Sequence, residues 1–348
     1  ERKLILDEKK TKRDIGRNKF LEKIWRWKSL SGDKIVNQLK RLGTAVDWSI
    51  SRFTLDGSCS VAVKEAFLRL YNSGFIYQDE RLVNWDPELQ TAVSDLEVNQ
   101  KEIYGNLWYI KYEIHNSNDF LIVATTRPET MFGDSAIAIH PKNKKLNFLI
   151  GKKVVIPLTN KIIPIISDEY ADPKKGSGAV KITPAHDFND FLVGKKHKIP
   201  IINILDKEAK LNKNVPSKFI GLDRYHARKK IIIMLKEKKQ LEKIVKNKMV
   251  VPVGDRSGSV IEPLLTKQWF LDSKKLSKKI QSSIKKKEIC FHPKSWMNTF
   301  KYWIDNIEPW CISRQIWWGH RIPIWYTDNG KKIAATDLKD AEAFIKKK

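Results

Sequence analysis

The stretch "ATTRPETMFGDSAIAIHP", residues 124–141, decides how the middle of this chain is read. It leaves an apolar, strand-like run through two threonines, Arg127, Glu129 and Thr130, and then returns to apolar alternation in "SAIAIHP". Alternation with a period of two residues is typical of a strand with one buried face. The stretch therefore predicts two strands separated by a polar interruption, and it raises the question of what that interruption does.

Short apolar runs of the same kind fill residues 105–248. They are bounded by turn residues and read "LWYIKYEI", "FLIVATT", "SAIAIHP", "KVVIPL", "IIPIIS", "GAVKIT" and "IPIINIL". Only "DFNDFLVGKKH" and "DRYHARKKIIIMLKEKKQ" have helical spacing in this part of the chain. Many strands with few helices predict a strand-rich, barrel-like or sandwich-like domain.

The flanking parts have a different pattern. Residues 1–104 contain "NKFLEKIWRWKSLSGDKIVNQLKRLG" and "SVAVKEAFLRLYNSG", both with apolar residues at helical spacing, before "RLVNWDPELQTAVSDLEV" becomes extended. Residues 249–348 are helical again in "QWFLDSKKLSKKIQSSIKKK" and then rich in aromatic residues. We therefore expect three parts, 1–104, 105–248 and 249–348, with a strand-rich middle.

Composition excludes several classes of protein. A hydrophobic content of 41% in 348 residues fits a soluble globular chain, and no apolar run reaches the roughly 18 to 20 residues that span a membrane. Three widely spaced cysteines without a CxxC pair argue against a disulfide framework or a cysteine zinc site. We expect a cytoplasmic protein with no membrane partner, and, because there is no starting Met, a piece of a longer chain.

The charge points to a polyanionic partner. Lys and Arg total 66 against 40 Asp and Glu, a formal net charge of +26, and such an excess favours nucleic acid through counterion release. Only 14 of the basic residues are Arg, however, and a base bias of the genome can enrich Lys without any binding role. Nucleic acid is the leading candidate, and the compositional explanation stays open.

A second polar interruption lies in "GSGAVKITPAHDFNDF", residues 176–191. Lys181 and Thr183 are two residues apart and share one face of a predicted strand, whereas Asp187 and Asp190 are three apart and share one face of a helical turn. With Arg127 they would line a pocket for a substrate that carries an ammonium group beside an anionic backbone. The structural alternatives remain: Asp187 caps the helix, Lys181 pairs with an acid and Arg127 closes a turn.

These two segments closely resemble the editing-domain motifs of the valyl-tRNA synthetase family, which are class I aminoacyl-tRNA synthetases. The resemblance extends over nearly the whole chain, because "GRNKFLEKIWRWK", "RLGTAVDWSISRFTLD", "LVNWDPELQTAVSDLEV", "GLDRYHARKKI", "IEPLLTKQWF" and "WCISRQIWWGHRIPIWY" look like family segments in family order. Isoleucyl and leucyl enzymes share looser forms of the threonine-rich and "PAH" segments. Lys181 and Thr183 before the proline favour the valyl family.

The resemblance implies a strand-rich editing domain inserted into a partial Rossmann-type catalytic domain. The whole enzyme would use ATP and Mg2+ to attach L-valine to tRNA(Val). Threonine is nearly isosteric with valine, and an apolar pocket cannot strongly reject an isostere that merely adds a hydroxyl, a problem for which the valyl enzyme is the standard example. The inserted domain would therefore hydrolyse the ester of threonyl-tRNA(Val), with no cofactor and no metal, and we expect a monomer.

The resemblance also implies roles for particular residues. Asp190 would hold the ammonium group of the substrate, and water would be the nucleophile. Thr125, Arg127 and Thr130 would line the cavity near the terminal adenosine. Lys181, Thr183 and Asp187 would complete the catalytic set with Asp190, and the resemblance leaves open which of these three contacts the threonine hydroxyl. We interpret His186 with Asp187 as a structural turn pair, with direct catalysis by His186 as the alternative.

Two signatures of ATP handling are missing from the sequence. The sequence contains no H-x-G-H. The similar stretch "WWGHR" at 317–321 belongs to the family segment where the chain re-enters the catalytic fold. "KLSKK" at 275–279 fits a solvated helix face better than the mobile lysine signature. Asp86 and Glu88 stand where bacterial members of the family often have Cys and Lys, which weakens the case for a metal there. We expect this chain to be inactive in aminoacylation. The alternatives are an isoleucyl or leucyl editing domain and a non-enzymatic basic RNA-binding module.

Overall fold

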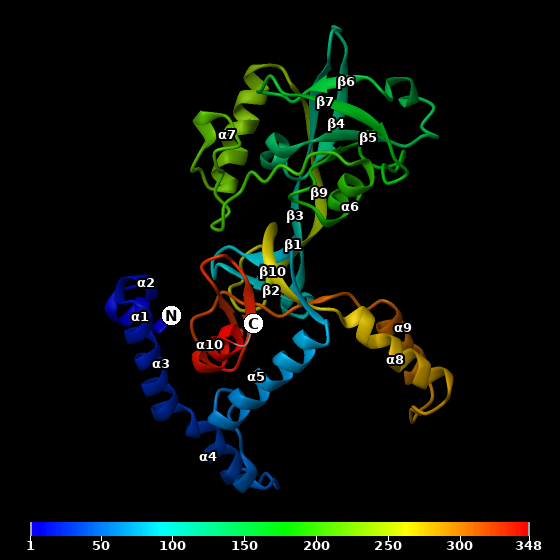
Figure 1. Ribbon diagram of the computed structural model, residues 1–348. Coiled ribbons are helices and arrows are strands. Elements are labelled where there is room, and N and C mark those ends of the chain that lie inside the picture. Colours follow the sequence, from blue (N-terminus) through cyan, green and yellow to red (C-terminus); the bar gives the residue numbers. More distant parts are fainter. Residues whose placement is uncertain (1, 347–348) are drawn as a thin grey trace. The chain divides into compact units, whose positions relative to one another are not determined.

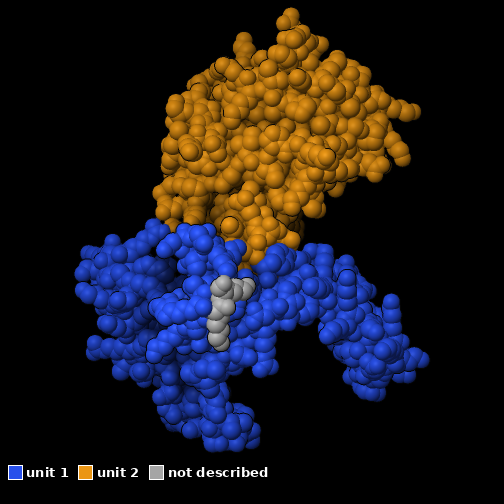
Figure 2. Space-filling view, in the orientation of Figure 1, with its two compact units in different colours: residues 1–77, 271–309, 315–348 blue, residues 78–270, 310–314 orange. Residues whose placement is uncertain are grey.

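A computed structural model describes residues 2–346, which divide into two compact units (Figures 1 and 2). Unit 1 comprises residues 1–77, 271–309 and 315–348, and unit 2 comprises residues 78–270 and 310–314. The two boundaries predicted from the sequence, near 104 and 248, fall inside two strands that pair with each other, β3 (Val98–Ile114) and β9 (Leu241–Gly254). The division into functional parts stays a prediction.

Unit 1 is mostly helical, as its apolar spacing predicts. Gly32 separates α3 from α4, and Asp56 caps α5 by accepting a hydrogen bond from the Cys59 N–H at 2.8 Å. The "KLSKK" segment lies on α8, in agreement with the helical interpretation. The elements are α1 (Arg2–Glu8), α2 (Lys12–Ile15), α3 (Arg17–Ser31), α4 (Asp33–Arg41), η1 (Trp48–Ile50), α5 (Gly57–Asn72), α8 (Ser273–Lys285), α9 (Trp296–Asp305), β12 (Ile324–Tyr326), β13 (Lys332–Ala334) and α10 (Leu338–Lys346).

Unit 2 is built on a seven-stranded sheet. Its strand order is β4-β3-β6-β7-β5-β8, and β9 pairs with β3 outside this path. The first and last strands of the path, β4 and β8, also lie in contact, so the sheet curls toward a barrel. This confirms the mixed α/β class with a strand-rich, curled domain. The remaining bounds are β4 (Phe120–Thr125), β5 (Ala136–Ile139), β6 (Lys153–Val155), β7 (Ile162–Ser167) and β8 (Ala179–Ile182).

A smaller four-stranded sheet and two helices complete unit 2. The sheet has the order β11-β10-β1-β2, and both predicted helices are present as α6 and α7. Among residues 2–346, no helix combines the length and the apolar character needed to cross a bilayer. The bounds are β1 (Ile76–Asp86), β2 (Thr91–Val93), η2 (Asp95–Glu97), η3 (Pro128–Gly133), η4 (Asn147–Leu149), α6 (Phe188–His197), η5 (Ser217–Phe219), α7 (Arg224–Glu237), β10 (Glu262–Leu271) and β11 (Trp310–Cys311).

One predicted strand is wrong. "IPIINIL", residues 199–205, forms no strand and makes only an isolated bridge at Leu205. Side chains satisfy its backbone instead: the carbonyl of Asn203 accepts hydrogen bonds from the Asn212 and Asn214 amides, and the Ile204 N–H donates to His186 at 3.0 Å. Ile204 and Leu205 are nevertheless buried, so the apolar pattern reports burial here rather than strand pairing.

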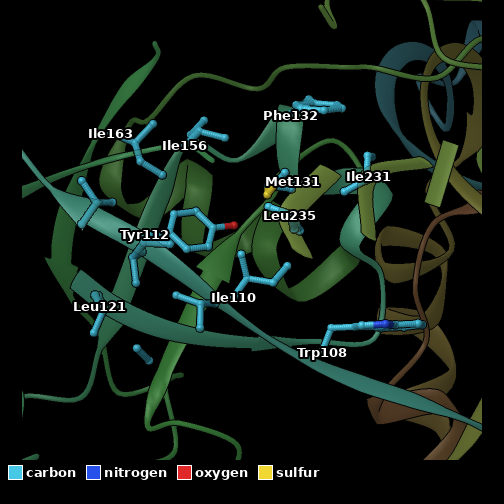
Figure 3. Packing of buried hydrophobic residues seen from close by; sticks show 14 of the residues in the cluster. Trp108, Ile110, Tyr112, Leu121, Met131, Phe132, Ile156, Ile163, Ile231 and Leu235 are labelled. Carbon is cyan, nitrogen blue, oxygen red and sulfur yellow. The ribbon is translucent and has the colours of Figure 1, made fainter. Parts of the chain in front are cut away.

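The core of unit 2 fixes the segments that carry the polar interruptions (Figure 3). Alternate residues of β3 point into it, including Trp108, Ile110 and Tyr112, and α7 contributes Ile231 and Leu235. The turn η3, at the end of the first polar interruption, is anchored by Met131 and Phe132, which are completely buried. Burying each such side chain stabilises the fold by about 1.5 to 3 kcal/mol. Met131 and Phe132 therefore fix the position of η3, and with it the polar residues that η3 carries.

Candidate functional site

The two polar interruptions lie side by side because β5, which follows the first, pairs with β8, which leads into the second. β5, after η3, runs antiparallel to β8 with Ile137 opposite Lys181, and the Ser135 N–H donates to the carbonyl of Ile182 at 2.9 Å. This register places η3 beside the end of β8, where the chain breaks at Pro184 before α6. Residues more than fifty positions apart in the sequence thus form one cluster.

Lys181 lies at the centre of this cluster. Its ammonium group donates to Thr130 Oγ1 at 2.8 Å, to Asp134 Oδ1 at 3.1 Å and to Thr183 Oγ1. Its side chain is only 10% exposed, and a lysine ammonium has three N–H groups, so all three have acceptors. Three of the predicted site residues are therefore brought together, and the interpretation that Lys181 pairs with an acid is also correct.

The acid is Asp134, which the sequence analysis missed. Its carboxylate is fully buried and accepts hydrogen bonds from Thr183 Oγ1 and from the Tyr112 hydroxyl, each at 2.7 Å. Burial raises the pKa of Asp134 above its ordinary value although Lys181 acts in the opposite direction, and burial together with Asp134 raises the pKa of Tyr112. Below we call Lys181, Thr130, Thr183, Asp134 and Tyr112 the lysine cluster.

Asp190 borders the lysine cluster through the backbone. One of its carboxylate oxygens accepts a hydrogen bond from the Thr183 N–H at 2.8 Å, and the residue is 5% exposed. Burial, and then the negative charge of Asp187, raises the pKa of Asp190 to about 7. A buried carboxyl group with a strongly raised pKa beside a polar cluster is a candidate functional group.

Asp187 is exposed and is the N-cap of α6. Its carboxylate accepts hydrogen bonds from the Asn189 N–H at 2.8 Å and the Asp190 N–H at 3.0 Å. The capping interpretation of Asp187 is therefore correct, and its carboxylate positions the first turn of the helix that carries Asp190.

His186, the other member of the predicted turn pair, is buried. Its backbone N–H donates to the carbonyl of Thr183 at 2.9 Å, which closes the turn, and its Nε2 accepts a hydrogen bond from the Ile204 N–H at 3.0 Å. Burial, together with the positive charges of Arg127 and Lys181, lowers the pKa of His186 well below its ordinary value. The neutral ring thus connects the turn to residues 199–205, in agreement with the structural interpretation.

Arg127 joins the site from the other side. Its N–H donates to Thr125 Oγ1 at 3.0 Å and its carbonyl accepts from Thr130 Oγ1 at 3.0 Å, which shapes the end of β4. Its guanidinium group donates to Glu129 at 3.4 Å, to the carbonyl of His186 at 3.1 Å and to Glu262. Burial lowers the pKa of Arg127, but Glu262 and Glu129 more than offset it, so this residue does more than close a turn.

The arrangement supplies hydroxyl groups, one ammonium group, a guanidinium group and the carboxylates of Glu129, Asp134, Asp187 and Asp190 within two adjoining segments. Such a set can bind a polar ligand that carries a hydroxyl and an ammonium group, and can position water beside it. Among residues 2–346, no group of three or more His, Cys, Asp or Glu side chains is arranged to hold a metal ion. Sequence analysis missed Asp134, Tyr112 and Glu262. Tyr112 lies on β3, Glu262 lies on β10, and Asp134 lies between η3 and β5, so their contacts depend on strand pairing that the sequence could not supply.

Known proteins resemble this chain over its length. The family described as tRNA synthetases class I (I, L, M and V) matches residues 1–348. Valine–tRNA ligase of Pelagibacter ubique is 52% identical over 338 residues, covering 97% of this chain and 38% of the ligase, and that of Nitrobacter winogradskyi is 50% identical over 363 residues, covering 98% and 38%. The chain thus spans well under half the length of these curated relatives.

One solved structure with similarity is the ternary complex of Agrobacterium radiobacter K84 agnB2 LeuRS, tRNA and LeuAMS. It has a TM-score of 0.33 and 18% sequence identity, and the match covers 88% of this chain and 40% of that one.

Proposed function

This chain belongs to the class I tRNA synthetases (I, L, M and V), and from that membership we propose that it is part of a valine–tRNA ligase and carries hydrolytic editing of threonyl-tRNA(Val). The family predicted from the sequence is confirmed, and identities of about 50% to valine–tRNA ligases support the valyl branch over the isoleucyl and leucyl ones. The whole ligase would attach L-valine to tRNA(Val) with ATP, as a cytoplasmic monomer.

The lysine cluster is the observation that carries the editing proposal. It places three hydroxyl groups, an ammonium group and a carboxylate where one strand ends, with Asp190 one backbone hydrogen bond away. A threonyl group differs from a valyl group by one hydroxyl in place of a methyl. A buried cluster whose every member already exchanges hydrogen bonds is suited to accept that hydroxyl and unsuited to accept the methyl.

In the proposed reaction, ionised Asp190 binds the ammonium group of the threonyl ester. The hydroxyl of the substrate enters hydrogen bonds with Lys181 and Thr183, and Thr125, Arg127 and Thr130 lie toward the terminal adenosine. Asp187 acts through the helix terminus that orients Asp190. A water molecule attacks the ester carbonyl, the bond to the ribose oxygen breaks, and threonine leaves from tRNA that again carries its hydroxyl. Holding ester and water in place supplies much of the acceleration.

ATP and Mg2+ belong to ligation rather than to this hydrolysis. The buried carboxylate of Asp134 is fully engaged by Lys181, Thr183 and Tyr112, so it does not fit a divalent cation.

The test is deacylation of threonyl-tRNA(Val) beside valyl-tRNA(Val). We expect the wild-type chain to clear the threonyl ester selectively and Asp190→Ala to lose this activity, whereas Asp119→Ala, which removes an exposed carboxylate from a hairpin loop, retains it. If the chain instead deacylated mischarged tRNA(Ile) or tRNA(Leu), it would belong to the isoleucyl or leucyl branch of the family. Binding of RNA without deacylation of any ester by the wild type would favour a non-enzymatic RNA-binding module.

A further inference from the structure

Five buried or half-buried charged groups alternate in sign through unit 2. Arg224 Nη1 donates to Glu262 Oε1 at 2.7 Å, and the other oxygen of Glu262 accepts from Arg127. Arg127 in turn contacts Glu129, which Arg228 holds through two hydrogen bonds of 2.7 Å. We call this series the ion ladder; it joins α7, β10 and η3.

Glu262 holds Arg127 more firmly than Glu129 does. Both oxygens of Glu129 are taken by the fork of Arg228, and its contact with Arg127 is long, at 3.4 Å. Glu262 instead gives one oxygen to each of its two arginines, and the one given to Arg127 is in close contact. Because Glu129 is already held by the fork of Arg228 and lies at 3.4 Å from Arg127, the orientation of Arg127 depends chiefly on its close, charge-assisted hydrogen bond to Glu262.

Some N–H groups of Arg127 have no acceptor among the described residues and could bind a ligand. A guanidinium group has five N–H donors, and within the described residues three of those of Arg127 have acceptors: Glu129, the carbonyl of His186, and Glu262. The Arg127 side chain is 29% exposed, against 6% for Glu262 and 5% for Arg224. Three guanidinium groups against two carboxylates give the ladder a net charge of +1, and Arg127 is its most exposed member.

We propose that Glu262 is a positioning residue of the editing site, which fixes Arg127 so that its remaining N–H groups meet the 3′-terminal nucleotide of the tRNA. This inference rests on the proposed function, because the position of that nucleotide comes from it. Glu262 lies on β10, beyond the residues 105–248 expected to form the inserted domain. The strand on which the chain returns is thereby part of the editing site.

The experiment compares Glu262→Gln with Glu102→Gln in the chain of residues 1–348. Both substitutions remove one carboxylate charge from an ion pair, but the pair of Glu102 with Lys248 is exposed, at 65% and 55% of the two side chains. With threonyl-tRNA(Val), we expect Glu262→Gln to raise KM about tenfold to a hundredfold, the range for losing a hydrogen bond to a charged group, and to change kcat much less. Glu102→Gln should behave as the wild type.

A double-mutant cycle separates positioning from a general structural role. If Glu262 acts through Arg127, Glu262→Gln adds little to KM once Arg127→Ala is present. Additive effects would overturn the proposal, as would an unchanged KM in a folded Glu262→Gln protein. Should Glu262→Gln fail to fold, Glu262→Asp keeps the charge and shortens the reach, and it should show the same rise in KM to a smaller extent.

A binding measurement distinguishes this proposal from the proposed function. An uncharged microhelix that ends in the CCA of tRNA(Val) is titrated by fluorescence anisotropy, so no hydrolysis is required. Weaker binding by Glu262→Gln than by Glu102→Gln would support positioning even if the wild-type chain cleared no ester. Equal binding by the two variants, or no binding by the wild type, would overturn it.

Discussion

Replacing Lys181 with Met tests how much the lysine cluster contributes to the fold. Methionine keeps most of the aliphatic length but removes the ammonium group and its three hydrogen bonds. Asp134 then keeps only Thr183 and Tyr112 as donors while its carboxylate stays fully buried. The perturbation thus leaves one partner of a buried ion pair without its counter-charge.

The expected cost follows from that geometry. Removing one partner of a buried pair destabilises a protein by about 3 to 5 kcal/mol, and in domains of about 150 to 250 residues each kcal/mol shifts Tm by about 2 to 4 °C. We therefore expect the calorimetric transition of unit 2 to fall by about 6 to 20 °C. Hydrogen exchange should accelerate in peptides from β5 and β8. Lys181→Met with Asp134→Asn removes both charges and should recover part of the loss.

The stability lost in Lys181→Met should depend on pH, and the pKa of Asp134 sets the direction of that dependence. Burial raises the pKa of Asp134 and Lys181 lowers it, so the pKa rises further when Lys181 is replaced. The folded variant then keeps a proton that the unfolded chain has released above about pH 4, and its stability falls as the pH rises. The deficit relative to wild type should be larger at pH 8 than at pH 5. A loss of less than about 0.5 kcal/mol, or the same deficit at both pH values, would refute this account of the cluster.

Three further changes test neighbouring residues. Because Asp190 has a pKa of about 7, its ionised form appears as the pH rises, and kcat/KM for deacylation should increase from about pH 6 to 8. The stability that protonated Asp190 contributes is fully present below its unfolded pKa and should be lost by about pH 7. Both trends should be absent in Asp190→Asn. Asp187→Ala should lower the free energy of unfolding by about 1 kcal/mol in thermal unfolding. Asp187→Asn should lower it far less, because the amide oxygen of Asn can cap the helix as the carboxylate oxygen does. Equal losses for the two variants would contradict the capping role. A Cβ on Gly194 would lie 2.8 Å from Pro184 Cγ, so Gly194→Ala should destabilise unit 2 by about 1 to 3 kcal/mol in urea unfolding, and an unchanged midpoint would contradict this packing.

Periodicity predicted most elements of the fold because burial and secondary structure usually coincide. The runs at 162–167 and 178–183 became β7 and β8, and the two helical patterns became α6 and α7. Residues 199–205 show where the coincidence fails. Their apolar side chains are buried as a strand's would be, but amide and imidazole groups from elsewhere satisfy the backbone, and no local pattern distinguishes these two arrangements.

The site was predictable only along contiguous sequence. Lys181 and Thr183 share a face because they are two residues apart, and the structure places both in one cluster. Asp134 and Tyr112 required the register between strands, which a single sequence leaves open. A weak signal existed for Tyr112: it lies on the buried face of a strand that alternates regularly, and a buried phenol needs a hydrogen-bond partner.

The saturation of Lys181 bears on how the proposed editing site would choose its substrate. Each of its three N–H groups has an acceptor, so an incoming hydroxyl gains a place by exchange with Thr130 or Thr183 rather than by filling an unused bond. Such an exchange conserves the number of hydrogen bonds. A valyl methyl in the same position would displace a partner and replace nothing, and a buried polar group left unsatisfied costs about 1 to 3 kcal/mol. In the proposed function, selectivity for the threonyl ester thus arises from the penalty on valine, and the tighter the cluster is internally, the larger that penalty becomes.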